Sequence, residues 1–94
     1  MRIALTRSGG FTGTRVRVEL DTAGLPAGEE QRLRDLLAAA ELKASRSPAV
    51  RDAFTYDLAI EDGGRLSTCR TDDSAMNDHT RELVDWLLEH APRV

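Results

Sequence analysis

The sequence has few of the residues that build disulfides, metal clusters or membrane spans. It contains a single cysteine, Cys69, so no internal disulfide can form and no zinc cluster can be assembled from thiols. No stretch approaches the roughly 18 consecutive apolar residues of a membrane span, and the apolar start at residues 1–5 is too short for the core of a signal peptide. We therefore expect a cytoplasmic protein that does not enter a membrane, with export by another route left open.

Charge of one sign and aromatic rings are also scarce. Thirteen basic residues are scattered among sixteen acidic ones, which gives a formal net charge of −3 and disfavours nucleic-acid binding. The only aromatic residues are Phe11, Phe54, Tyr56 and Trp86. At 94 residues, the chain is expected to form one domain, residues 1–94, that folds without metals or disulfides and is a monomer when free.

Alternating apolar and polar residues predict two strands near the start of the chain, over residues 2–7 and 14–20. Between them lies Ser8–Gly13, where three glycines surround the large apolar ring of Phe11. An ordinary hairpin needs only a polar turn at this place. We expect the two strands to pair as a hairpin through this unusual loop.

The spacing of apolar residues then changes to that of amphipathic helices. One helix is predicted over residues 27–41 and a second over 78–91, with Asn77 as the N-cap of the second. Residues 43–52 have no periodicity and are expected to form a loop. Two further strands are predicted, at 54–61 and after the glycine turn at 62–64.

The turn at residues 62–64 allows two registers for the second hairpin. A two-residue turn would place Cys69 beside Leu58 on the apolar face. A three-residue loop would instead place Leu66 opposite Ile60 and pair an acid with a base on the wet face. We predict the second register, which places Cys69 on the outer face.

The predicted elements follow the order β-β-α-β-β-α, with no internal repeat. This order is typical of an α+β fold in which two helices pack on one face of a four-stranded, mainly antiparallel sheet.

Side chains that could perform catalysis or bind metal are thinly spread. His79 and His90 lie three turns apart on the second predicted helix, so they cannot bind one ion together. A site built from His79 with Asp72 or Asp73 has no recognised ligand spacing, and solvated capping acids are the favoured interpretation. We therefore predict no enzyme, metal or cofactor, and a small enzyme using His79 and nearby acids is the least favoured alternative.

Phe11 has two interpretations on physical grounds. The ring is either a plug folded back on the body of the domain or an anchor offered to a partner, because loops lie at the surface and often carry function. The neighbouring glycines give the backbone freedom without supplying side chains that would bury the ring. The residues alone leave both interpretations open.

Five short motifs, in their order and spacing, resemble those of emfourin-type proteins, which are small protein inhibitors of protealysin and other thermolysin-like zinc metalloproteases. The motifs are Arg7–Phe11, Leu20–Thr22, Asp52–Tyr56, Asp72-Asp73 and Leu83–Leu87. Together they span nearly the whole chain. The resemblance implies an inhibitor without enzymatic activity that occludes the active-site cleft of a thermolysin-like metalloprotease.

The resemblance also suggests how the loop would act. Thermolysin-like enzymes favour a bulky apolar residue just after the scissile bond, so an exposed Phe11 would fill that pocket as a substrate mimic. The expected protease-binding residues are Arg7, Ser8, Gly9, Gly10, Phe11, Thr12 and Gly13. One loop is smaller than a standard interface, so more surface must contribute. Residues 62–64 and 46–51 are candidates, although ordinary solvated turns are the favoured interpretation of both. The alternative is a binding module that uses the same loop on another protein.

Overall fold

The computed structural model describes residues 1–9, 13–40, 54–73 and 75–94. Within these residues, four strands and two α-helices follow the predicted order and form an α+β fold. The elements are β1 (Arg2–Gly9), β2 (Thr14–Asp21), the 3-10 turn η1 (Thr22–Gly24), α1 (Ala27–Ala40), β3 (Phe54–Asp62), β4 (Arg65–Asp72) and α2 (Asp78–His90). The predicted element types are therefore confirmed.

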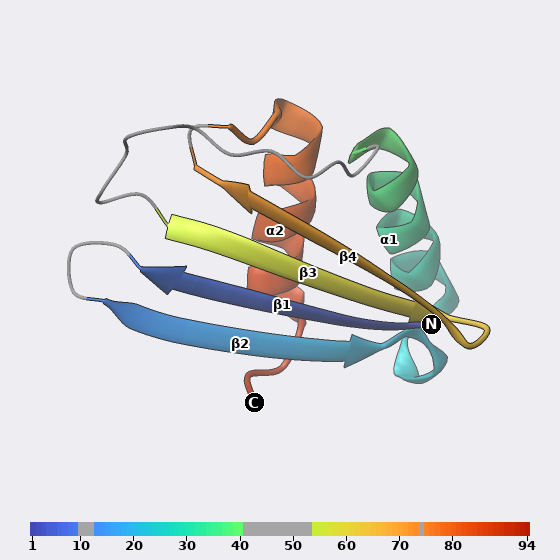
Figure 1. The fold of residues 1–94 in the computed structure, drawn as a ribbon. Helices are drawn as coiled ribbons and strands as arrows, with labels where there is room; N and C mark the ends of the chain where they lie inside the picture. Colours follow the sequence, from blue (N-terminus) through green and yellow to red (C-terminus); the bar gives the residue numbers. More distant parts are fainter. Residues whose placement is uncertain (10–12, 41–53, 74) are drawn as a thin grey trace.

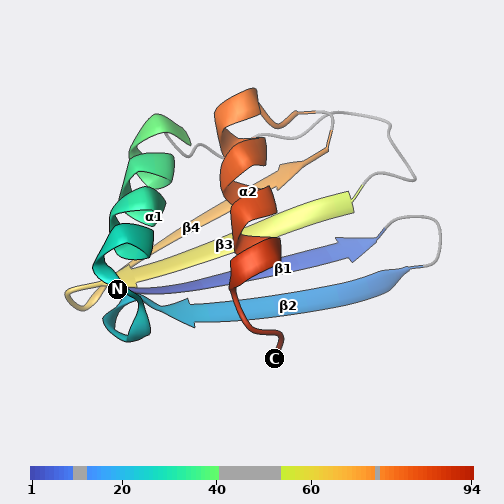
Figure 2. The ribbon, with the colours of Figure 1, turned by 180° about the vertical axis from the view of Figure 1, so that it is seen from behind.

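The strands form one antiparallel sheet in the order β2-β1-β3-β4, with β1 and β3 at its centre. Both helices lie on the same face of the sheet, behind it in Figure 1 and in front of it in Figure 2. This is the predicted packing. Neither helix covers the opposite face, which carries the polar side chains of the alternating strands.

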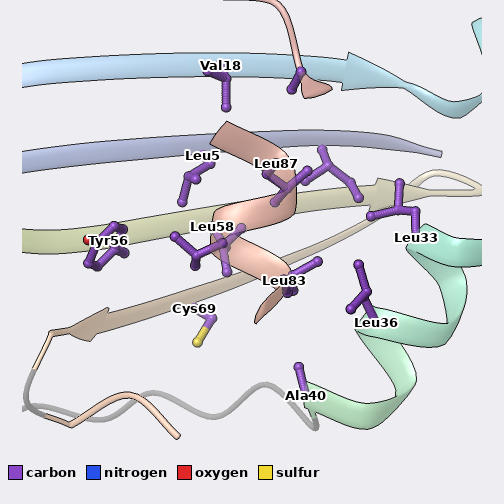
Figure 3. Packing of buried hydrophobic residues seen from close by; sticks show 13 residues of the cluster. Leu5, Val18, Leu33, Leu36, Ala40, Tyr56, Leu58, Cys69, Leu83 and Leu87 are labelled. Atoms are coloured by element: carbon purple, nitrogen blue, oxygen red, sulfur yellow. The ribbon is translucent and has the colours of Figure 1, made fainter. Parts of the chain in front are cut away.

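The core fills the space between the sheet and the two helices (Figure 3). Across the central strands, Leu5 lies opposite both Val18 and Leu58, so one row of aliphatic side chains crosses three strands. The helices contribute the buried residues Leu33, Leu36, Ala40, Leu83, Val84 and Leu87. Each helix therefore buries an apolar stripe against the sheet, as its spacing predicts.

The helix ends agree with the local sequence. The Asn77 side chain accepts a hydrogen bond from the Thr80 backbone N at 2.8 Å, which confirms the predicted N-cap of α2. α2 ends at His90, and Ala91 is its C-cap, one residue before Pro92. Among the described residues, neither helix is long and apolar enough to cross a membrane.

The predicted register of the second hairpin is wrong. A two-residue turn at residues 63–64 joins β3 to β4, and Leu58 lies opposite Cys69. Both glycines of the turn have positive φ angles, 60° and 81°, which a type I′ turn requires. Cys69 is therefore buried on the helix-covered face instead of lying on the outer face, and Leu66 is 66% exposed. The twist and φ requirements of the turn outweigh the burial of one leucine.

The C-terminal segment covers part of the outer edge of β2. The backbone N of Glu19 donates to the Pro92 carbonyl oxygen at 3.1 Å, and the backbone N of Val94 donates to the Arg17 carbonyl oxygen at 3.0 Å. Such contacts protect the hydrogen-bonding groups of an edge strand from pairing with another chain. The C-terminus is thereby fixed beside β2 (Figure 2).

Candidate functional site

The predicted loop joins two strands at one end of the sheet, where other segments also meet. Gly9 at the end of β1 lies opposite Thr14 of β2 and opposite Phe54, the first residue of β3. The C-terminal end of β4 reaches the same end of the sheet, as Figure 1 shows. We call this region the loop end, defined by residues 7–9, 13–14, 54–56 and 72–73.

Two glycines with positive φ angles flank the centre of the loop. Gly9 has a φ of 95° and Gly13 a φ of 66°, a region that residues with a side chain rarely adopt. Gly13 is exposed, and a Cβ atom added to it would meet nothing within 4 Å. Gly10, Phe11 and Thr12 lie outside the described residues, so the exposure of Phe11 stays a prediction.

Arg7 lies half-buried on the helix-covered face, in the row of Val16 and Tyr56. Its guanidinium carbon is 4.6 Å from the centroid of the Phe54 ring, a cation–π contact. The Arg7 Nε atom is buried and has no hydrogen-bond partner among the described residues. The ring face offsets part of that desolvation, so Arg7 is engaged within the chain just before the loop.

Ser8 points to the other face of the sheet. It is half-buried, between Arg15 of β2 and Thr55 of β3. Of the seven predicted protease-binding residues, the structure therefore describes Arg7, Ser8, Gly9 and Gly13, and it places all four at the loop end. Their contact with a protease stays a prediction.

Asp73, the residue after β4, holds the beginning of β3. Its Oδ2 atom accepts a hydrogen bond from the backbone N of Phe54 at 3.1 Å, and its own backbone N donates to the Phe54 carbonyl oxygen at 3.2 Å. The Tyr56 hydroxyl also interacts electrostatically with this carboxylate. From α2, Arg81 Nη2 donates to Asp73 Oδ1 at 3.3 Å and to the Asp73 carbonyl oxygen at 3.1 Å. One side chain thus joins β3, the end of β4 and α2.

The electrostatics of this contact keep Tyr56 protonated. Burial raises the pKa of Tyr56 above its ordinary value, and the hydrogen bond to Asp73 and its negative charge raise it further, while Arg7 and Arg81 act in the opposite direction. The hydroxyl is therefore a neutral donor at physiological pH. It can hold the Asp73 carboxylate without losing its proton.

The groups considered for catalysis have different surroundings. His79 is exposed on α2, and the ring of His90 stacks on Trp86 with 4.4 Å between the ring centroids. Burial raises the pKa of the Cys69 thiol, which keeps it protonated at neutral pH. In the part of the chain that the structure describes, no group of three or more His, Cys, Asp or Glu residues could hold a metal ion.

Sequence reasoning missed the roles of Tyr56, Asp73 and Arg81. It treated Asp72 and Asp73 as solvated capping acids, and it gave Arg81 no role. The available signal was the register of the second hairpin, because the observed pairing of Thr55 with Asp72 brings the next residue, Asp73, beside Phe54.

Comparison with known protein families matches residues 5–88 to the family model Emfourin. The match covers most of the chain and includes Arg7, Asp73, all of α1 and all of α2 except its last two residues. No curated protein and no solved structure matches the chain.

Proposed function

The chain belongs to the emfourin family of protease inhibitors, and from this premise we propose that it inhibits a thermolysin-like zinc metalloprotease by occluding the active-site cleft with the Ser8–Gly13 loop. The proposal is supported by the way the two ends of the loop are attached to the sheet. Both strands that flank it are paired up to Gly9 and Thr14, and β1 is also paired with β3. The residues at the base of the loop are therefore ordered before a partner binds, so ordering them does not reduce the affinity.

In this proposal Phe11 is the anchor. Its ring enters the pocket that accepts a bulky apolar residue just after the scissile bond, as a substrate side chain would. The flanking glycines let the backbone approach the walls of the cleft closely. Resistance to cleavage comes from holding the loop in a geometry that does not fit the reaction. The inhibitor blocks access to the zinc ion of the protease without removing the ion.

Additional contact area must come from surface beside the loop, because a standard interface takes about 800 Å² from each partner. The exposed residues Thr14 and Arg15 at the start of β2 adjoin the loop and are suitable. The turn at residues 62–64 is not suitable, because it lies at the opposite end of β3, roughly 26 Å away at about 3.3 Å per strand residue. Residues 46–51 lie outside the described part of the chain.

Truncation of the anchor tests the proposal. Phe11→Ala is expected to raise the inhibition constant against a thermolysin-like protease by at least about tenfold, because an interface anchor contributes about 2 kcal/mol. The melting temperature should stay nearly unchanged. The matched control is Leu66→Ala, which removes an exposed apolar side chain beside the turn at residues 63–64 and should change inhibition by less than about twofold.

The opposite pattern would contradict this role. A large fall in melting temperature for Phe11→Ala, with inhibition intact, would make the ring a structural plug and move the protease contact elsewhere.

A further inference from the structure

We infer that Asp73 is the positioning residue of the Ser8–Gly13 loop, because it fixes the beginning of β3 against α2 and so holds the base of the loop in place before a protease binds. The inference rests on the proposed function for the role of the loop. It rests on the contacts of Asp73 for the positioning itself. Asp73 need not touch the protease to act in this way.

Asp73 and Phe54 form a reciprocal pair of hydrogen bonds. The backbone N of Phe54 donates to the Asp73 carboxylate, and the backbone N of Asp73 donates to the Phe54 carbonyl oxygen. Two hydrogen bonds in opposite directions hold the Phe54 backbone on both sides of its Cα atom. Hydrogen bonds to a charged acceptor are stronger than neutral ones, so the carboxylate contributes more than a neutral turn residue would.

The beginning of β3 in turn contacts the end of β1. Phe54 lies opposite Gly9, the last residue of β1, so an immobile Phe54 backbone restrains the point where the chain leaves the sheet. The Phe54 ring also carries the guanidinium of Arg7, two residues before that point. Backbone and side chain therefore both connect Phe54 to the end of β1.

Asp73 also contacts the body of the domain. Arg81 on the first half of α2 donates to both the carboxylate and the carbonyl oxygen of Asp73. The same carboxylate interacts electrostatically with the hydroxyl of Tyr56, a core residue that is 4% exposed. The base of the loop is thus tied to a packed helix and to the core.

Such a restraint matters because a loosely held loop must be ordered when it binds, and that ordering reduces affinity. The restraint also helps the inhibitor to resist cleavage by the protease, because a mobile loop samples conformations that can be cut. Release of Asp73 should therefore weaken inhibition without unfolding the protein.

Asp73→Asn is the primary test. The amide keeps the shape of the side chain, but it presents an NH₂ donor to either the Phe54 N–H or the Arg81 guanidinium. We expect the inhibition constant of Asp73→Asn to be at least about tenfold higher than that of the wild type when it is measured well below the melting temperature of the variant. Most of this change should lie in the dissociation rate. Asp57→Asn is the matched control. It breaks the 2.6 Å ion pair with Arg70 on the uncovered face and should change inhibition by less than about twofold.

Tyr56→Phe separates positioning from direct contact. Tyr56 is only 4% exposed, and Asp73 is the charged group that affects its hydroxyl most, so we expect the hydroxyl to act on inhibition mainly through Asp73. We expect an increase in the inhibition constant of about threefold or more, because one hydrogen bond to a charged group is lost. If Asp73→Asn weakens inhibition while Tyr56→Phe leaves it unchanged, Asp73 is a direct contact and the inference is wrong.

Nuclear magnetic resonance of the free protein tests the restraint without any protease. The backbone order parameters of Gly9 and Gly13 should fall in Asp73→Asn and stay unchanged in Asp57→Asn. Absence of inhibition by the wild type would overturn the proposed function and leave this measurement to decide the restraint. Unchanged order parameters, or wild-type inhibition by both Asp73→Asn and Tyr56→Phe, would overturn the inference.

Discussion

Replacement of Gly13 by alanine tests the backbone geometry at the base of the loop. Gly13 has a φ of 66° and is exposed, and an added Cβ would have no neighbour within 4 Å. The substitution therefore introduces no collision with the rest of the molecule. Any loss of stability measures the left-handed backbone conformation itself.

The expected loss follows from two opposing effects. A left-handed conformation costs a residue with a side chain roughly 1–2 kcal/mol. Alanine also restricts the unfolded chain, which returns about 0.4–1 kcal/mol of stability. We therefore expect Gly13→Ala to lower the free energy of unfolding by about 1 kcal/mol, or the melting temperature by about 4–8 °C for a domain of this size. Gly13→Asn should lose less, because asparagine tolerates this conformation better.

Urea denaturation of the purified proteins measures the effect. The matched control is Gly28→Ala in α1, where the glycine also has open space around it but its φ is not positive. Because alanine is the better helix former, this control should gain up to about 1 kcal/mol. If Gly13→Ala is as stable as the wild type while the control behaves as expected, the left-handed geometry at the base of the loop is refuted.

Two further predictions concern the core. Tyr56 in the unfolded chain ionises near pH 10, and burial together with its hydrogen bond to Asp73 raises the pKa in the folded protein. The stability present below about pH 10 should therefore be lost as the pH rises through the folded pKa, by up to about 1.4 kcal/mol per pH unit. Denaturation at alkaline pH should show a shallower decline for Tyr56→Phe, and an identical decline would contradict this assignment. Leu83→Ala should lower the free energy of unfolding by roughly 2.7–5 kcal/mol, since Leu83 is fully buried, and a loss below about 1 kcal/mol in urea denaturation would be inconsistent with the packing.

The types and order of the elements could be predicted because side-chain periodicity records which face of an element is buried. The alternation of Val16, Val18 and Leu20 predicted β2, and the spacing of Leu33 and Leu36 predicted α1. The residues at which strands end were harder to predict from the sequence. β1 continues to Gly9, beyond the predicted end at residue 7, because its last residues pair with neighbours on both sides without contributing to an apolar pattern.

The register of the second hairpin could not be chosen from burial alone. Placing Leu66 opposite Ile60 has an apparent advantage in buried apolar area, but the observed turn places Ser67 there. On an edge strand, one exposed leucine is a small penalty compared with a turn whose twist fits the strands.

The same one-residue error concealed the most connected residue of the loop end. In the predicted register Asp72 would lie opposite Phe54, whereas the observed register brings Asp73 beside it. The contact with Arg81 also depends on how α2 packs against the sheet. The spacing of residues in the sequence does not predict that packing. The loop could be recognised as a candidate from its composition, but the contacts that hold its base required the structure.

We propose that this chain occupies the active-site cleft of a thermolysin-like metalloprotease. The most direct test of this proposal is titration of the purified protein against such a protease, including one encoded beside it, with peptide hydrolysis measured at several substrate concentrations. We expect hydrolysis to fall toward zero with added protein and the apparent inhibition constant to rise linearly with substrate concentration. Unchanged hydrolysis at a molar excess of the protein would contradict the proposal.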